Sequence, residues 1–423
     1  MIAILSPSTT HKHHDQPPKL IVISFDGFKW DYLDFVKNSF NYSTPNFDML
    51  ISSGVSISND GVLNAFVTKT FPNHYSIATG RYEENHGIVG NSFYDPLFNE
   101  TFDISSPDGT DSKWWDGKSG KLVEPIWITN QKCGCNGTCE CERYSGVVFW
   151  VGSDVEGQHP TRFLHYNKSM DFKDRLIQLL EWFTDEESPI NFGMVYFNEP
   201  DSTGHEYGPN STEIAKKIIE LDKLLGEFLE MLKEKKLMSS VNIILTSDHG
   251  MVYQREVIIL SDYVDVSLFQ IYGTSLVYNI LPKPGHLEEV YKILSNISHL
   301  NVYKKEHIPT EYHYRNNRRI LDLVLTVEEG YRVCMSRNDT YCMLMKGDHG
   351  YNNSLKSMHP IFIASGPAFK VNYKLERPFE IVDLYSLMCY ILKLPPHDND
   401  GDFKRVESIL NIKREVYLTE NLV

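Results

Sequence analysis

The run KLIVISFDG (residues 19–27) decides the fold. It is almost continuously apolar and rich in β-branched residues up to Phe25, which is typical of a strand that is buried on both faces. Segments of the same character follow at residues 192–198 (FGMVYFN), 241–245 (VNIIL) and 360–364 (PIFIA). Strands of this kind are typical of parallel sheets, so we expect the core to be built around one.

Helical patterns alternate with these strands. Apolar residues recur at spacings of three and four in residues 172–183, 212–237 and 380–392. The alternation predicts an α/β fold with a mostly parallel central sheet and helices on both faces. Residues 95–145 are irregular and rich in Gly, Cys and Trp, so we expect an inserted lobe there. A single domain is expected over residues 19–412.

The two ends and the overall charge narrow the classes of protein that fit. Residues 1–18 are expected to form a disordered tail, and residues 413–423 a C-terminal tail. The net charge of −15 argues against a broad nucleic-acid-binding face, so no duplex is expected as a partner. No run of about 18 apolar residues occurs, so contact with a membrane would require an anchor outside this chain. An anionic substrate would have to be attracted locally, by bound cations.

Acidic residues follow three of the four predicted strands, at Asp26, Asp201 and Asp248. Because ligands bind beyond the carboxyl ends of strands in open α/β sheets, we expect these carboxylates to converge. His205 lies four residues after Asp201, and His249 directly follows Asp248. One Asp–His pair alone would more often be structural. The joint pattern favours Zn²⁺, and two such ions about 4 Å apart can clamp the oxygens of phosphoryl transfer.

The segment KTFPNH (residues 69–74) has the pattern of a helix start. Thr70 with Pro72 two residues later fits an N-terminal turn, so helix capping is one interpretation of the threonine. A helix N-terminus is also an anion-binding site. A threonine hydroxyl placed there and bound to a metal would serve as a nucleophile toward phosphorus.

Five segments together resemble the ectonucleotide pyrophosphatase/phosphodiesterase family of the alkaline phosphatase superfamily. They are VISFDGF (22–28), TKTFPNHYSIATGRYEENHGIVGN (68–91), EPDSTGHEYGP (199–209), TSDHGM (246–251) and GDHGYNN (347–353). The similarity covers about residues 19–412 and implies an alkaline-phosphatase-like fold for a single phosphodiesterase catalytic domain. The phrases PIWITNQ (125–131) and SMHPIFIASGPAF (357–369) are most similar to the short fourth and fifth members.

The resemblance implies a role for each residue of a site with two zinc ions. One zinc would be held by Asp201, His205 and His349, and the other by Asp26, Thr70, Asp248 and His249. Thr70 would be the nucleophile, and Asn91 would help to bind a phosphate oxygen. Positions around the nucleotide are matched by Lys69, Phe71, Trp150, Asp154 and Tyr166, with Phe71 and Tyr166 on either side of the base. Only the resemblance selects His349 over the nearby His359.

The activity implied is the hydrolysis of phosphodiester and pyrophosphate bonds in nucleotides. Dinucleoside polyphosphates, NAD, ATP and ADP stay open as substrates, and the product would be a nucleoside 5′-monophosphate formed through a phosphothreonine intermediate. We expect a monomer whose partner is the small nucleotide. Cleavage of choline lipids, as in other members of the family, is one alternative. A non-catalytic binding or adhesion module is another, although the complete ligand set and Thr70 argue against it.

Sequons and cysteines indicate an extracellular protein, either secreted or on the cell surface. The chain has eight N-x-Ser/Thr sequons, at Asn41, Asn99, Asn136, Asn167, Asn210, Asn296, Asn338 and Asn352. These glycosylation motifs are more frequent than chance predicts, which favours passage through the secretory route.

The cysteines fall into three groups. A C-x-C-x3-C-x-C loop, absent from the nearest relatives, contains Cys133, Cys135, Cys139 and Cys141. It predicts two local disulfides of undetermined pairing, with a four-cysteine zinc knot as the alternative. Cys334 and Cys342 would staple a hairpin. Cys389 lies in an apolar helical pattern and is expected to be a buried free thiol.

Overall fold

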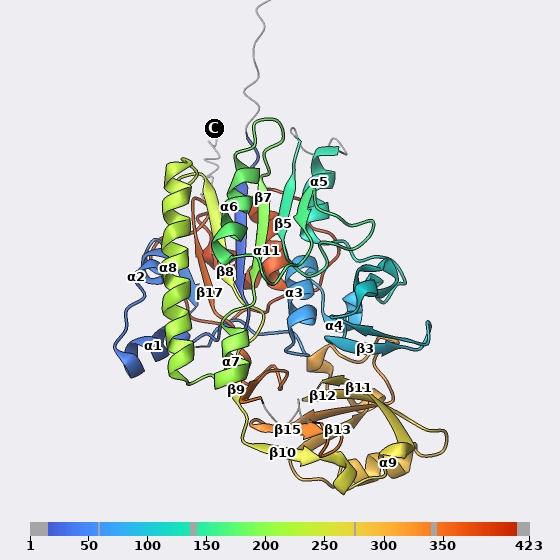
Figure 1. Ribbon diagram of the computed structural model, residues 1–423. Coiled ribbons are helices and arrows are strands. Elements are labelled where there is room, and N and C mark those ends of the chain that lie inside the picture. Colours follow the sequence, from blue (N-terminus) through green and yellow to red (C-terminus); the bar gives the residue numbers. More distant parts are fainter. Residues whose placement is uncertain (1–15, 58–59, 136–141, 275, 340–344, 413–423) are drawn as a thin grey trace, which may run out of the picture.

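The computed structural model describes residues 16–57, 60–135, 142–274, 276–339 and 345–412. Its centre is a twisted sheet of eight strands with helices on both faces (Figure 1). From one edge to the other, the strands are β18 (Tyr373–Leu375), β2 (Gly54–Ile57), β17 (Phe362–Ser365), β8 (Val241–Thr246), β1 (Lys19–Phe25), β7 (Phe192–Phe197), β5 (Ser145–Val148) and β6 (Arg162–Leu164).

Strand β1 occupies the middle of the sheet and runs parallel to both of its neighbours, β7 and β8. Its residues from Leu20 to Phe25 are almost completely buried, as the apolar run predicts. The carboxyl ends of these three strands therefore lie at one edge. Strand β17 differs, because it runs antiparallel to β8. The chain reaches β17 after a long excursion outside the sheet and not through a single crossover helix, so nothing forces a parallel direction.

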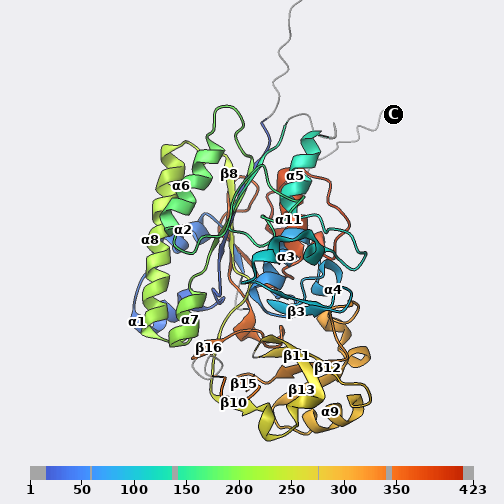
Figure 2. The ribbon, with the colours of Figure 1, turned by 45° about the vertical axis from the view of Figure 1, so that its right-hand side comes forward.

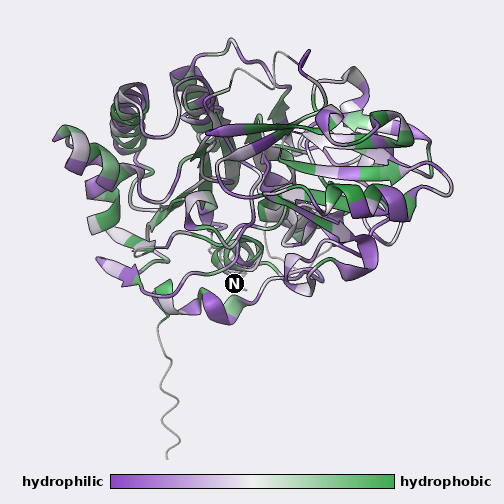
Figure 3. Cartoon of the chain, turned by 90° about the horizontal axis from the view of Figure 1, so that it is seen from below, coloured by the Kyte–Doolittle hydropathy of each residue, from purple (hydrophilic) through white to green (hydrophobic). Residues whose placement is uncertain are grey.

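Helices cover the two faces of the sheet in separate layers (Figures 1 and 2). One layer contains α1 (Tyr32–Phe40), α2 (Pro45–Ser52), α6 (Phe172–Phe183) and α8 (Thr212–Glu234), and the other contains α3 (Thr70–Thr79), α5 (Ile126–Cys135) and α11 (Asp383–Leu392). Each layer encloses its own hydrophobic cluster against the sheet. Figure 3 shows hydrophilic and hydrophobic residues alternating around the outer helices, as expected for helices that bury one stripe.

A second lobe, which the sequence patterns did not reveal, is formed by residues 254–274, 276–339 and 345–346. Its four-stranded antiparallel sheet has the order β11 (Phe269–Thr274), β12 (Val277–Pro282), β14 (Leu323–Val327) and β13 (Leu300–Lys304), and helix α9 (Leu287–Leu294) packs on it. The parallel pair of β10 (Glu256–Ile259) and β15 (Tyr331–Cys334) adjoins this sheet. We call this unit the antiparallel lobe. The short pair of β9 (Val252–Tyr253) and β16 (Gly347–Asp348) joins it to the main sheet.

In the described part of the expected irregular lobe, residues 95–135 and 142–145, regular structure is scarce apart from α5. It begins in the hairpin of β3 (Ser92–Asp95) and β4 (Glu100–Asp103). Two further short helices, α4 (Glu83–His86) and α7 (Asp201–Tyr207), lie near the carboxyl edge of the sheet (Figure 1). None of the helices in the described ranges is long and apolar enough to cross a membrane.

The cysteines partly match the expectations. Cys389 is buried and free, and burial raises the pKa of its thiol to about 12, so that prediction is confirmed. Cys133 and Cys334 are disulfide-bonded, which contradicts a zinc knot that would need Cys133 as a free thiolate. The pairings predicted for Cys139, Cys141 and Cys342 fall outside the described residues.

Candidate active site

The carboxyl edge of the central sheet brings the three strand-end aspartates together. Asp26 follows β1, Asp201 opens α7, and Asp248 follows β8. The backbone N–H of Asp201 donates to the carbonyl of Asp26 over 3.0 Å. Gly27 has a φ of +68°, and a Cβ atom there would lie 2.9 Å from Cα of Asp201. A glycine is required at this position because a larger residue would push the two aspartates apart.

A first group of side chains that could hold a metal ion consists of Asp201, His205 and His349. Nε2 of His205 lies 3.4 Å from Oδ2 of Asp201, and Nε2 of His349 lies 3.6 Å from Oδ1. The pair Asp201 and His205 comes from one turn of α7, whereas His349 comes from the chain after β16, far along the sequence.

A second group lies directly beside the first, and its Asp26, Asp248 and His249 are almost completely buried. Nε2 of His249 is 3.3 Å from Oδ1 of Asp26 and 3.0 Å from Oδ2 of Asp248. The hydroxyl of Thr70 lies 3.4 Å from the same nitrogen. Asp201 belongs to both groups, since its carboxylate also lies within 4.8 Å of the ligand atoms of Asp26 and His249. The structure thus assembles all seven residues that the sequence nominated as metal ligands.

The side chains of both groups are arranged as a cation site requires. Each histidine places Nδ1 against a backbone carbonyl, of Gly347 for His205, Gly250 for His249 and Thr68 for His349, at distances of 2.8, 2.9 and 3.0 Å. Donation from Nδ1 leaves Nε2 as the ligating nitrogen and fixes the ring, as at known metal centres. One carboxylate oxygen in each of Asp26, Asp201 and Asp248 is buried without a hydrogen bond among the described residues. Lone pairs of oxygen and nitrogen therefore face one another, and positive charge is needed between them.

The shifted pKa values of these side chains also indicate a site for a cation. Burial and the neighbouring carboxylates of Asp248 and Asp201 raise the pKa of Asp26 well above its usual value. Burial, together with the nearby charge of His249, lowers the pKa of His349. Against its burial, the carboxylate of Asp248 raises the pKa of His249. A cation would stabilise three acids and three imidazoles packed this closely. Their nitrogen and oxygen atoms form a ligand set that suits zinc.

Thr70 is the first residue of α3, and its hydroxyl faces the second group. Lys69 occupies the N-cap position of this helix, and within the described chain no side chain caps it. The capping interpretation of Thr70 is therefore wrong. The carbonyl of Thr70 instead accepts a hydrogen bond from Nδ1 of His74 over 2.8 Å, which holds the first turn. The hydroxyl is left to point at the metal-ligating cluster from a helix N-terminus.

A cavity of about 600 Å³ opens beside the two groups and contains most of the predicted substrate contacts. Its walls include Phe71, Asn91, Trp150, Asp154 and Tyr166. Oδ1 of Asn91 accepts the backbone N–H of Phe71 over 2.9 Å, so its amide nitrogen is turned away from that contact. Tyr166 is 52% exposed and stands edge-on to Phe149, at the rim.

Lys69 is the predicted substrate contact that the structure does not bring to this cavity. Its side chain is buried, and its ammonium lies 3.4 Å from Oδ1 of Asp348. His359 also lies apart, with its ring nitrogens on the carbonyls of Asp60 and Asn353. Sequence reasoning missed Tyr196, whose hydroxyl donates to Oδ2 of Asp26 over 2.5 Å. The one sequence signal for Tyr196 was its hydroxyl group, near the end of an otherwise apolar strand.

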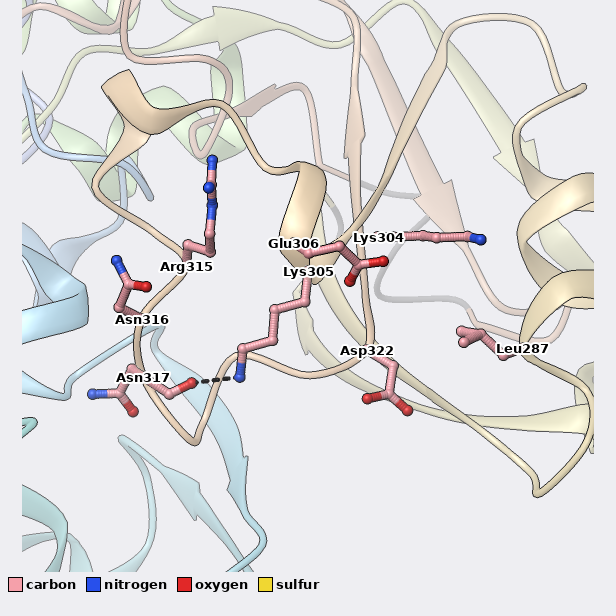
Figure 4. A pocket seen from close by; sticks show the side chains of 8 residues that line it. All are labelled: Leu287, Lys304, Lys305, Glu306, Arg315, Asn316, Asn317 and Asp322. Atoms are coloured by element: carbon pink, nitrogen blue, oxygen red, sulfur yellow. Dashed lines mark hydrogen bonds between the residues drawn. The ribbon is translucent and has the colours of Figure 1, made fainter.

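A second cavity, of about 450 Å³, lies in the antiparallel lobe and shares no lining residue with the first. It mixes Lys304, Lys305 and Arg315 with the acids Glu306 and Asp322. Figure 4 shows the ammonium of Lys305 reaching the backbone carbonyl of Asn317, at 2.8 Å. Lys304 is paired with Glu288. Arg315 donates to the carbonyl of Ile308, so all three cations already have partners. We therefore assign the chemistry to the first cavity.

Known proteins are similar to this chain in sequence and in fold. The family model for type I phosphodiesterase / nucleotide pyrophosphatase matches residues 20–352. The chain is 39% identical over 416 residues to human ectonucleotide pyrophosphatase/phosphodiesterase family member 5, covering 97% of this chain and 82% of the relative. It is 41% identical over 401 residues to human bis(5′-adenosyl)-triphosphatase ENPP4, covering 93% and 82%.

Solved structures agree. Murine ectonucleotide pyrophosphatase/phosphodiesterase 5 superimposes with a TM-score of 0.85 at 42% identity, covering 93% of this chain and all of the other. An inactive threonine-to-alanine variant of that protein, in complex with AMP, gives the same TM-score at 41% identity. The predicted α/β, alkaline-phosphatase-like architecture is thereby confirmed. The chain belongs to the ectonucleotide pyrophosphatase/phosphodiesterase family and is a hydrolase of that family, whose members depend on metal.

Proposed function

We propose that this protein is an extracellular, zinc-dependent hydrolase that cleaves phosphodiester or pyrophosphate bonds of nucleotides and releases nucleoside 5′-monophosphates. One observation carries the proposal. The hydroxyl of Thr70 stands at the N-terminus of α3, 3.4 Å from Nε2 of His249, inside a cluster of three aspartates and three histidines. A hydroxyl in that position is suited to act as a nucleophile toward a phosphate.

The proposed reaction has two displacements at phosphorus. Two zinc ions held by the two groups would lower the pKa of the Thr70 hydroxyl and offset charge on the phosphate oxygens. The oxygen of Thr70 forms a bond to phosphorus while the bond to the leaving group breaks, giving a phosphothreonine. Water then attacks, the bond to Thr70 breaks, and the nucleoside monophosphate departs. The amide nitrogen of Asn91 would donate to a phosphate oxygen, since its Oδ1 is already held by Phe71.

The cavity next to the nucleophile suits a nucleoside. Phe71 and Tyr166 line it as aromatic faces for a base, and Trp150 closes the inner wall, its indole N–H bound to the carbonyl of His74 over 3.0 Å. Asp154 is largely buried, and burial raises the pKa of its carboxyl group. It would accept hydrogen bonds from a base. The relatives lend support, since one is named a bis(5′-adenosyl)-triphosphatase and another was solved with AMP.

Location and assembly complete the proposal. The family name denotes ectoenzymes, and the disulfide-bonded Cys133 and Cys334 fit an oxidising compartment. We propose that the protein acts outside the cytosol as a monomer, in secreted or surface-attached form, with the catalytic domain at residues 19–412.

The test compares Thr70→Ala and Thr70→Ser on dinucleoside polyphosphates, NAD, ATP and lysophosphatidylcholine. Wild type is expected to release nucleoside 5′-monophosphates, and Thr70→Ser is expected to keep part of that activity. Thr70→Ala is expected to lose turnover while zinc content, measured by mass spectrometry, stays near that of wild type. Near-normal activity of Thr70→Ala would end the proposal. Release of phosphocholine without nucleotide cleavage would move the protein to the lipid-cleaving members, and wild type without zinc or activity would favour a binding role.

A further inference from the structure

A buried carboxylate joins the chain segment of the nucleophile to the segment of a metal ligand. Oδ1 of Asp348 lies 3.4 Å from the ammonium of Lys69, and Oδ2 accepts a hydrogen bond from the guanidinium of Arg332. All three residues are at least 95% buried, with exposures of 1% for Asp348, 5% for Lys69 and 1% for Arg332. Buried charges are tolerated only when they are paired and well placed, so this cluster has little freedom to shift.

Two residues of this cluster are sequence neighbours of residues in the candidate active site. Lys69 immediately precedes Thr70, and Asp348 immediately precedes His349. Oδ1 of Asp348 also accepts the backbone N–H of His349 over 2.8 Å. The carboxylate therefore contacts both the residue before the nucleophile and the backbone of the ligand.

Further contacts connect the chain segment before Thr70 with the segment that contains His349. Nδ1 of His349 lies 3.0 Å from the carbonyl of Thr68, and the hydroxyl of Thr68 donates to the carbonyl of Tyr351 over 2.9 Å. Gly350 has a φ of +125°, and a Cβ atom there would lie 2.6 Å from Cε of Lys69. A glycine is needed because the Lys69 side chain runs against the backbone on its way to Asp348.

We propose that Asp348, with Lys69 and Arg332, is a positioning cluster that sets the distance between the Thr70 hydroxyl and the His349 imidazole. The proposal rests on the proposed function and deepens it. Lys69 acts through Asp348 and does not contact the nucleotide. Arg332 belongs to β15 of the antiparallel lobe, so this lobe supplies one of the groups that hold the metal-ligating cluster in place.

The first test uses Asp348→Asn, which keeps the shape of the side chain and removes its charge. We expect kcat to fall by about 10- to 100-fold with KM nearly unchanged, because a shift of the nucleophile by a fraction of an ångström is costly to the chemical step. The chelator concentration that removes half of the zinc is expected to fall, since a neutral amide oxygen holds the backbone N–H of His349 less tightly than the carboxylate does.

Asp383→Asn is the matched control. Asp383 is a fully buried aspartate paired with Arg405 over 2.7 and 2.8 Å, at the start of α11. Its substitution is expected to lower the melting temperature about as much as Asp348→Asn does, with kcat and zinc retention unchanged. Equal effects of the two substitutions on kcat would reduce Asp348 to a merely structural role and overturn the proposal.

The second test separates positioning from nucleotide binding at Lys69. Lys69→Gln is assayed on a nucleotide ester, thymidine 5′-monophosphate p-nitrophenyl ester, and on bis(p-nitrophenyl) phosphate, which lacks a nucleoside. A positioning role predicts the same fractional loss of kcat on both esters, and recovery in Lys69→Arg. A rise in KM confined to the nucleotide ester would overturn the inference while leaving the proposed function intact. Inactive wild type would count against the proposed function instead.

Discussion

The hydroxyl of Tyr196 donates to Oδ2 of Asp26 over 2.5 Å, from the same strand whose end presents Asp201. This contact orients the carboxylate so that Oδ1 faces Nε2 of His249. We predict that Tyr196→Phe weakens zinc binding by about 10- to 100-fold, the usual effect of losing a partner behind a metal ligand.

Zinc retention against a graded chelator measures the effect of Tyr196→Phe. Tyr75→Phe is the control, since the Tyr75 hydroxyl is also buried but donates to the carbonyl of Val123. Unchanged zinc retention in Tyr196→Phe would show that packing alone orients Asp26.

Removal of metal is expected to destabilise the fold as well as to stop turnover. The aspartates at residues 26, 201 and 248 lie together, each with one oxygen that accepts no hydrogen bond from the described residues, and they repel one another when no cation lies between them. A ligand present at about 1,000 times its dissociation constant stabilises the folded state by about 4 kcal/mol. We predict that chelation lowers the melting temperature and that zinc restores it. Asp201→Asn should respond less to the chelator, and equal melting curves of wild type with and without chelator would count against the site.

Stacking on the nucleotide base should appear in KM. Phe71→Ala or Tyr166→Ala removes one aromatic face of the cavity, and base stacking contributes about 1–3 kcal/mol, which corresponds to roughly 5- to 150-fold in affinity. We predict a rise of KM within that range for nucleotide esters and little change for bis(p-nitrophenyl) phosphate. Tyr390→Ala is a control, because Tyr390 of α11 is nearly as exposed as Tyr166 but stacks on Phe403, outside the cavity. An equal loss of activity on both substrates would show that the two rings only pack in the site and do not bind the base.

The buried His86 predicts a pH dependence of stability. Burial lowers the pKa of His86 to about 3, and its Nδ1 accepts the N–H of Ile88, which requires a neutral ring. The unfolded chain binds a proton near pH 6.5 and the folded chain does not. The free energy of unfolding therefore falls as the pH drops from about 6.5, by on the order of 2–3 kcal/mol down to pH 4.5.

Urea unfolding of His86→Gln at pH 7.0, 5.5 and 4.5 tests this dependence. The variant should be less stable at pH 7 but should lose less stability on acidification than wild type. His286→Gln, a change at an exposed histidine, should keep the wild-type slope. An unchanged slope in His86→Gln would assign the acid sensitivity to other groups.

The sequons offer a test of the extracellular proposal. Asn41, Asn99, Asn167, Asn210, Asn296 and Asn338 are exposed. Asn352 is half-buried, and its amide nitrogen donates to the hydroxyl of Tyr312 over 2.9 Å. Mass spectrometry of protein secreted from eukaryotic cells is expected to find glycans among the exposed sites and none on Asn352. A fully unmodified secreted protein would remove this support, and a glycan on Asn352 would mean that the chain is modified before this contact forms.

Much of the layout could be predicted from the sequence because it depends on local signals. The apolar run at residues 19–25 and the matching runs at 192–198 and 241–245 became β1, β7 and β8, with ends displaced by one residue at most. Helix α6 has the predicted bounds of 172–183, since its stripe of apolar residues and its Asp171 N-cap are both encoded nearby. The strand-end aspartates followed from the same logic, because parallel strands end at a common edge.

Tertiary structure decided what depends on distant segments. The antiparallel lobe was not predicted, since its short strands carry weak periodicity and gain stability only by pairing with one another. The direction of β17 depended on the path through that lobe. The partner of Lys69 is set by a carboxylate 279 residues away, so no local pattern could distinguish a nucleotide contact from a buried ion pair. Residue types along the chain determined which chemistry was available, and the packing of remote segments determined which side chains meet to perform it.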